Sequence, residues 1–82
     1  MPEKEFLELL DELFEQPPGT TRAVDSLTNH PAWSSLTFVG LIAMVDEECG
    51  VTLAPDDVRQ CETIGDLVTL LGEAVVPEKR AA

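Results

Sequence analysis

The sequence predicts an all-α fold: a small four-helix bundle of three main helices and one short helix, with a long loop between helices one and two. Three observations predict it. Apolar residues recur at helical spacing in three separate stretches, and capping or breaking residues stand at their ends. The length of 82 residues suits one domain, which buries roughly 60% of the surface that its unfolded chain exposes.

The first helix is expected over about residues 3–15. Pro2 suits a first helical position, and the run Pro17-Pro18-Gly19 is expected to stop the helix. The apolar residues of the stretch recur at helical spacing and are Phe6, Leu9, Leu10, Leu13 and Phe14. The acidic residues fall mostly on the other side and are Glu5, Glu8, Asp11, Glu12 and Glu15.

A long polar loop is expected over residues 20–34, where Thr, Asn, Asp, Ser and Pro dominate. Val24 and Leu27 are its isolated apolar anchors, and His30, followed by Pro31, is interpreted as a surface loop residue. Long loops inside compact domains are uncommon and often functional. The alternative is a plain connector across one end of the bundle.

The second helix is expected to begin at Ser34-Ser35 and to run to about Cys49, with Ser34 as its N-cap and Gly50 as its stop. Its apolar positions favour an inner face that places Leu36 and Val39 in the core and leaves Ser35 facing solvent. The positions assigned to this face are Leu36, Val39, Ile42 and Ala43, followed by Val45 and Cys49.

The last third of the chain predicts a short helical turn from Pro55 and a final helix after Thr63. Thr63 and Asp66 have the spacing of a capping box. The inner face of the final helix is expected to hold Ile64, Leu67, Val68 and Leu71. We therefore expect a compact domain over residues 1–75 and a flexible C-terminal tail over residues 76–82.

The formal net charge of −11, from 16 Asp and Glu against 5 Lys and Arg, argues against nucleic-acid and anionic-membrane partners and favours basic ones. The charge is uneven. Residues 1–15 carry −5 and residues 46–73 carry −7, whereas residues 16–45 are neutral. No apolar run reaches the roughly 20 residues of a membrane-spanning helix. The start of the chain lacks signal-peptide features, so a cytoplasmic protein is expected.

The sequence does not predict an enzyme or a metal site. Its single His cannot complete a metal site or a Ser-His-Asp triad. A calcium loop counted from Asp46 would place Val51 where the turn glycine belongs, so calcium binding is not expected. Cys49 and Cys61 do not form a C-x-x-C pair and are interpreted as two buried thiols.

Three runs together resemble the acyl carrier protein family. They are Trp33-Ser34-Ser35-Leu36-Thr37-Phe38-Val39, Ala43-Met44-Val45-Asp46-Glu47-Glu48-Cys49-Gly50-Val51 and Thr63-Ile64-Gly65-Asp66-Leu67. The family pattern is Asp-Ser-Leu at the start of the second helix, an acidic stretch ending in an aromatic and Gly, and a Thr-hydrophobic start to the last helix. The resemblance covers about residues 5–72.

The resemblance implies that Ser35 receives 4′-phosphopantetheine from coenzyme A through a separate phosphopantetheinyl transferase. The arm would then carry acyl or aminoacyl groups as thioesters, in fatty-acid-like or in specialised polyketide or peptide biosynthesis. The implied partners are that transferase, an acyl-loading ligase or adenylating enzyme, and a ketosynthase or acyltransferase, with the carrier a monomer. The implied partner-docking residues are Ser34, Leu36, Thr37, Phe38, Asp46, Glu47 and Glu48.

Other readings remain beside this one. Asp25-Ser26-Leu27 spells the motif literally, but Thr28-Asn29-His30-Pro31 follows it and cannot form an amphipathic helix, so Ser35 is favoured over Ser26. Ser34 stands where the family has Asp, which favours the alternative of an unmodified carrier fold acting as an acidic adaptor. Cys49 replaces the usual aromatic, and in the resembled fold it could lie close to Cys61. An unrelated helical bundle is the third alternative.

Overall fold

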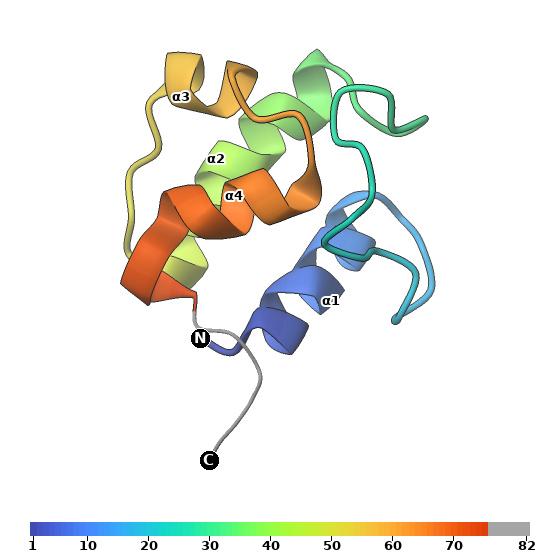
Figure 1. Cartoon of the computed structure of the whole chain (residues 1–82), viewed down its shortest axis with the longest axis horizontal. Coiled ribbons are helices and arrows are strands. Elements are labelled where there is room, and N and C mark those ends of the chain that lie inside the picture. The colour runs from blue at the N-terminus through green and yellow to red at the C-terminus, as the bar shows by residue number, and fades with distance from the viewer. Residues whose placement is uncertain (76–82) are drawn as a thin grey trace.

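The computed structural model describes residues 1–75 and confirms the all-α fold. Figure 1 shows helices α1, α2 and α4 around a common interior, with the short helix α3 at one end and the long first loop on the other side. The tail expected over residues 76–82 lies outside the described residues. The elements are α1 (Glu3–Leu13), α2 (Ser35–Cys49), α3 (Pro55–Arg59), α4 (Ile64–Leu71) and a 3₁₀ turn (Gly72–Ala74).

The core draws residues from all four helices and from the loops between them. Leu27 is fully buried, as predicted, whereas Val24 is 74% exposed, so its assignment as a core anchor was wrong. The N–H of Asp25 donates to the carbonyl of Arg22, and this turn carries Val24 on its outer side. The buried apolar residues are Phe6, Leu10, Phe14, Leu27, Leu41, Val45, Leu53, Val58, Cys61, Ile64, Leu67, Leu71 and Val75.

Helix α1 ends at Leu13, before the prolines that were expected to stop it. Glu15 has a left-handed backbone (φ 58°). Its N–H donates to the carbonyl of Glu12, and the next N–H, of Gln16, donates to the carbonyl of Asp11. These two bonds form a Schellman motif, in which Glu15 takes the position that glycine usually occupies. The stop is therefore built from hydrogen bonds at the helix end.

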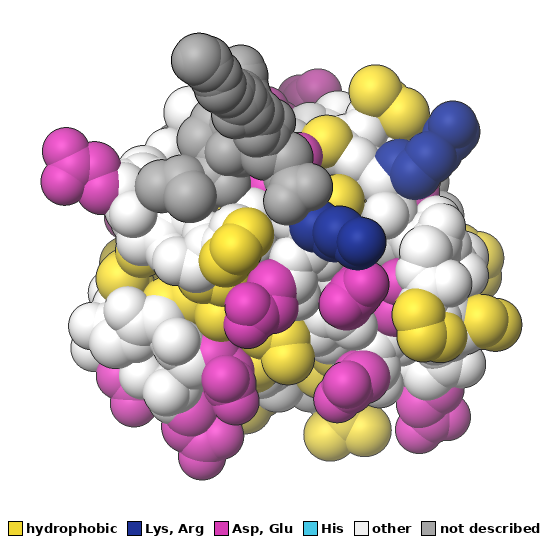
Figure 2. All heavy atoms as spheres, turned by 90° about the horizontal axis from the view of Figure 1, so that it is seen from below, with side chains coloured by type: hydrophobic (Ala, Val, Ile, Leu, Met, Phe, Trp, Pro, Cys, Tyr) yellow, Lys and Arg dark blue, Asp and Glu magenta, His cyan; other side chains and the backbone are white. Residues whose placement is uncertain are grey.

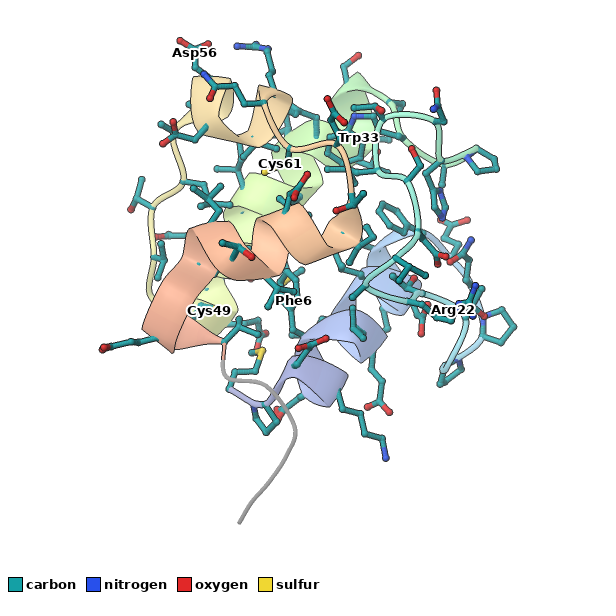
Figure 3. The ribbon with its side chains drawn as sticks, viewed as in Figure 1. Phe6, Arg22, Trp33, Cys49, Asp56 and Cys61 are labelled. Atoms are coloured by element: carbon teal, nitrogen blue, oxygen red, sulfur yellow. The ribbon has the colours of Figure 1, made fainter. Side chains whose placement is uncertain are left out.

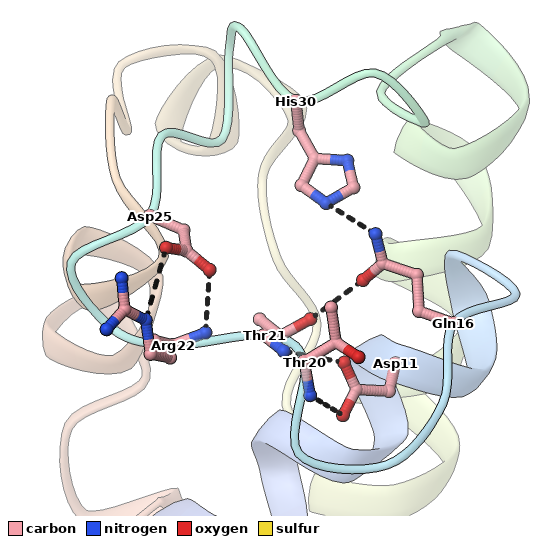
Figure 4. A network of polar contacts seen from close by, with 7 residues as sticks. All are labelled: Asp11, Gln16, Thr20, Thr21, Arg22, Asp25 and His30. Carbon is pink, nitrogen blue, oxygen red and sulfur yellow. Dashed lines mark hydrogen bonds and ion pairs between the residues drawn. The ribbon is translucent and has the colours of Figure 1, made fainter.

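Asp11 is 1% exposed, so its assignment to the polar face of α1 was wrong. Its carboxylate accepts hydrogen bonds from the backbone N–H groups of Gly19, Thr20 and Thr21, at 2.8, 3.3 and 2.8 Å (Figure 4). A buried carboxylate needs such partners to offset its lost hydration. The side chain therefore fastens the start of the long loop to α1.

Two helix starts confirm the caps predicted from the sequence. The hydroxyl of Ser34 accepts from the N–H of Thr37, and the hydroxyl of Thr63 accepts from the N–H of Asp66. Both are complete capping boxes, because the third residue of each helix also binds back to the cap. Gly50 ends α2 in the left-handed conformation (φ 69°), as expected of a C-cap glycine. At α1, Pro2 stands at the N-cap instead of the first helical position.

The face of α2 that turns inward agrees with the prediction at Val45 and differs from it at Leu36, Val39 and Ala43. Leu36 is 82% exposed and Val39 is 62% exposed, whereas Leu41 and Val45 are fully buried. At 100° per residue, the predicted positions 36, 39 and 43 form one stripe and positions 38, 41, 45 and 49 form another, across the helix. Because both stripes are apolar, spacing alone could not decide between them. The structure leaves the stripe of Leu36, Val39 and Ala43 exposed.

The surface mixes acidic and apolar side chains. Figure 2 shows one face of the molecule, on which Asp and Glu side chains surround exposed hydrophobic ones. Among residues 1–75, no helix combines the length and apolar character that crossing a membrane requires.

Candidate functional site

Ser35 is the first residue of α2, and its side chain is exposed. The capping bonds around it use its neighbours: the N–H of Ser34 donates to the hydroxyl of Thr37 at 2.8 Å, and the N–H of Thr37 donates to the hydroxyl of Ser34 at 3.4 Å. Within residues 1–75, none of the hydrogen bonds at this helix start engages the hydroxyl of Ser35. The hydroxyl is therefore free to react without breaking the cap.

The loop before Ser35 is held at a fixed place relative to α2. The hydroxyl of Thr37 donates to the carbonyl of Ala32 at 2.9 Å, and the N–H of Ala32 donates to Nδ1 of His30 at 3.0 Å. Since Nδ1 accepts, the proton of the neutral imidazole lies on Nε2, which faces the side-chain amide of Gln16 at 3.2 Å (Figure 4). That contact requires the amide oxygen of Gln16, not its nitrogen, to face Nε2.

His30 is half-buried and packs against α1, so it is more than the surface loop residue expected from the sequence. Its ring stacks on Phe14 at a centroid distance of 4.4 Å. Trp33 meets Phe14 edge-on at 6.4 Å and Phe38 edge-on at 5.9 Å. These aromatic contacts connect Phe14, the C-cap residue of α1, with the first turn of α2, where the attachment candidate Ser35 lies.

Phe38, which the resemblance implies as a docking residue, lies half-buried against the core. The guanidinium carbon of Arg59, at the end of α3, lies 5.0 Å from the centroid of its ring. Ser35 and Arg59 line a shallow hollow together with Trp33, Ser34 and Phe38. Figure 3 shows Trp33 at the N-terminal end of α2, far from Arg22 in the first loop.

Two further hollows flank the exposed stripe of α2. One, on the side of α1, is lined by residues that include Leu13, Leu36 and Gly40. The other, on the side of α3, is lined by residues that include Val39, Ile42 and Pro55. The exposed stripe of Leu36, Val39 and Ala43 is therefore an apolar ridge between the two hollows. The first turn of α2, to which Leu36 belongs, contains no acidic residue.

The acidic residues Asp46, Glu47 and Glu48 are all exposed in the last turns of α2. Asp46 lies eleven positions beyond Ser35, which corresponds to about 16 Å along a helix. The hydroxyl of Thr52 donates to Asp46 at 3.3 Å. Among residues 1–75, no three His, Cys, Asp or Glu side chains gather where they could hold a metal ion. The acids therefore form a surface separate from Ser35.

Both cysteines are free thiols. Cys61 is buried, as predicted, and its Sγ lies 3.5 Å from the carbonyl of Asp57, whereas Cys49 is only half-buried. Burial raises the pKa of the Cys61 thiol, and the carboxylates of Asp66 and Asp57 raise it further. Burial also raises the pKa of the Cys49 thiol, an effect that the positive amino terminus partly opposes.

The residues present fit a phosphate-linked arm. The exposed hydroxyl of Ser35 supplies an attachment atom, and a guanidinium, the side chain best matched to phosphate oxygens, lines the same hollow. Arg59 was counted in the charge balance but was not named as a site residue. It is the single basic residue of positions 34–71, and that signal could have found it.

Comparison with protein families gives one finding. Residues 34–71 match the family model described as the phosphopantetheine attachment site, as expected of a carrier domain of the acyl carrier protein family. In such a domain, 4′-phosphopantetheine is attached covalently. The match begins at Ser34 and spans α2, α3 and α4. Comparison with curated proteins and with solved structures gave no significant match.

Proposed function

We propose that this chain, whose residues 34–71 belong to the phosphopantetheine attachment site family, carries acyl or aminoacyl groups on an arm attached to Ser35. One observation carries the proposal. Ser35 is an exposed serine at the first position of α2, and the cap of that helix leaves its hydroxyl unused. A transferase can reach this oxygen without unfolding any element.

The proposed attachment is a phosphoryl-type transfer from coenzyme A. The Ser35 oxygen forms a bond to the phosphorus next to the pantetheine, and the pyrophosphate bond of coenzyme A breaks to release adenosine 3′,5′-bisphosphate. The hydroxyl proton passes to a base of the transferase, which also supplies the metal ion. When bound, the arm supplies a thiol that holds acyl groups as thioesters. The chain itself acts as a substrate and shuttle.

Intact mass measures this attachment directly. The wild-type chain is incubated with coenzyme A and a broad-specificity phosphopantetheinyl transferase, and we expect a gain of one phosphopantetheine. Ser35→Ala should abolish the gain. Ser26→Ala is the matched control, because Ser26 belongs to the literal Asp-Ser-Leu run in the first loop, and this variant should still be loaded. Loading of Ser35→Ala, or no loading of the wild type by any transferase, would overturn the proposal.

The docking surface that we propose combines the exposed stripe of α2 with the acids beyond it. The implied docking residues fall into two groups. Ser34, Leu36, Asp46, Glu47 and Glu48 are exposed, whereas Thr37 and Phe38 are half-buried and also hold the helix start in place. The neutral first turn and the apolar ridge favour partners with a less basic, more apolar docking surface at this end. A specialised pathway would match such partners.

A charge placed on the ridge tests this docking surface. Leu36→Asp should lower the kcat/KM of the transferase at least tenfold, because an apolar contact is replaced by a buried charge in the complex. Val24→Asp is the control, since Val24 is 74% exposed in the first loop and lies outside the ridge. Equal loss in both variants would show that the ridge is not the contact surface.

The second candidate is an unmodified carrier fold that acts as an acidic adaptor, and Ser34 favours it. Ser34 keeps the N-cap but lacks the charge of the family's Asp. Ser34→Asp retains a cap of equal quality and should raise the loading rate if the missing charge limits modification. An adaptor would stay unloaded in cells and still retain its partners after Ser35→Ala.

A further inference from the structure

Arg59 is a cation in an otherwise acidic part of the chain. It ends α3, whose first turn holds Asp56 and Asp57, and positions 34–71 contain no other Lys or Arg. Its side chain crosses from α3 to α2, where the guanidinium lies 5.0 Å from the ring centroid of Phe38. It thereby reaches the hollow that Ser35 lines.

Two contacts hold the guanidinium at that place. Nη1 donates to Asp56 at 2.8 Å, and the ring of Phe38 lies beneath the cation. Phe38 is in turn fixed by the edge-on contact with Trp33 at 5.9 Å. The bond to Asp56 uses one donor of a group that has five. The remaining N–H groups can serve another acceptor without loss of the existing bond.

The ion pair with Asp56 does not explain why an arginine occupies this position. Both side chains are largely exposed, 63% for Arg59 and 87% for Asp56, and pairs of this kind contribute little to folding stability. Contact with an aromatic face keeps the guanidinium beside α2 instead of extended into solvent. A phosphodiester attached to Ser35 would be an anion beside this cation and would serve as its counter-ion.

We propose that Arg59 is a positioning residue that donates hydrogen bonds to the phosphodiester oxygens of the arm once Ser35 is loaded. The inference rests on the proposed attachment at Ser35. A planar guanidinium can donate two parallel N–H bonds to two phosphate oxygens, a fork that the single nitrogen of an ammonium does not offer. The bonds would hold the root of the arm on the α3 side of Ser35, and the rest of the arm would remain free to reach partner enzymes.

The test uses the loaded chain and reads the phosphorus directly. Wild type, Arg59→Gln, Arg59→Lys and Arg22→Gln are loaded, and intact mass confirms one phosphopantetheine in each. Arg22 is the matched control, because it is 73% exposed and pairs with an aspartate three residues away, as Arg59 does. Thermal unfolding followed by circular dichroism checks that all variants fold alike. Phosphorus NMR and the arginine Nε–H signals are then compared.

We expect loading to shift the Nε–H signal of Arg59 and to leave that of Arg22 in place. Arg59→Gln should shift the phosphorus resonance, Arg59→Lys should shift it less, and Arg22→Gln should leave it unchanged. If loading does not shift the Nε–H signal of Arg59, or if Arg59→Gln does not shift the phosphorus resonance, the role of Arg59 is wrong and the attachment at Ser35 is unaffected. A wild-type chain that gains no mass overturns this inference together with the attachment at Ser35.

Discussion

Oδ1 of Asp11 accepts a 2.8 Å hydrogen bond from the backbone N–H of Thr21, ten residues along the chain. Oδ2 of the same carboxylate accepts from Gly19 at 2.8 Å and from Thr20 at 3.3 Å. One buried side chain of α1 thus fixes the beginning of the loop that ends at Ser35. Figure 4 shows how the contacts continue through Thr21 and Gln16 to His30. The position of the candidate site depends on this network.

Asp11→Ala should lower the free energy of unfolding by about 3 kcal/mol, because it leaves three buried or half-buried backbone N–H groups without their acceptor. Urea unfolding measures the loss. Glu12→Ala is the control on the same helix, since Glu12 is exposed, and it should change the value by less than about 0.5 kcal/mol. Equal effects of the two substitutions would rule out the role given to the Asp11 carboxylate.

Glu15→Gly should stabilise the protein by about 1 kcal/mol, because Glu15 holds a left-handed backbone (φ 58°) that glycine adopts without steric cost. Glu12→Gly, within the last turn of the same helix, should have the opposite sign and cost about 1 kcal/mol. Thermal or urea unfolding of both variants measures these changes in the free energy of unfolding. A loss of stability in Glu15→Gly would contradict the Schellman geometry at the end of α1.

The carboxyl of Asp66 should make part of the free energy of unfolding depend on pH in the acid range. Hydrogen bonds from the N–H groups of Glu62 and Thr63 lower the pKa of its carboxyl, so the folded state favours the charged form. The contribution is therefore complete well above the ordinary Asp pKa of about 3.9 and is lost as the pH falls through the lower folded value. Asp66→Asn should be less stable than wild type at pH 7.

The difference between wild type and Asp66→Asn should shrink as the pH is lowered below the ordinary Asp value, because protonation removes the same bonds from the wild type. Urea unfolding at several pH values between 7 and 3 follows this difference. If it stayed constant across that range, the carboxylate of Asp66 would not be the origin of the effect.

The two cysteines should react slowly with alkylating reagents at pH 7. Burial is the main cause of the raised pKa of both thiols, so the reactive thiolate is scarcer than in an unfolded chain. Iodoacetamide labelling followed by mass spectrometry should show rates below that of a free cysteine and rising with pH. In the loaded chain the thiol of the arm should be labelled first, and labelling of Cys49 or Cys61 ahead of it would contradict this expectation.

The helix ends were predictable because their signals are local. Ser34, Gly50 and Thr63 form their caps with residues at most four positions away, so the sequence around each contains all the partners. Asp11 could not be placed in the same way. Its three partners lie eight to ten residues away, beyond the end of the helix. Its burial depends on where the loop passes over α1, and the helical spacing of residues in the sequence says nothing about that path.

At the candidate site, the place of Ser35 in the fold could be predicted from the sequence, whereas most of the residues around it could not. The position of Ser35 at the start of α2 followed from the cap and the apolar stretch. The inward face of α2 followed only in part. Val45 was predicted to face inward and is buried, but Leu36 and Val39 were assigned inward and Leu41 was not, because the two stripes across the helix are both apolar. The approach of Arg59 to Phe38 joins two residues twenty-one positions apart in the sequence, and only the fold brings them together.

Trp33 gives the molecule an optical property that follows from its place in the fold. The chain contains one Trp and no Tyr, so its near-ultraviolet emission comes from a single indole. That indole contacts Phe14 and Phe38 and lines the hollow beside Ser35. Changes in emission therefore originate where α1, the first loop and the start of α2 meet. Loading of the arm and docking of partners can be followed there in real time on the unlabelled protein.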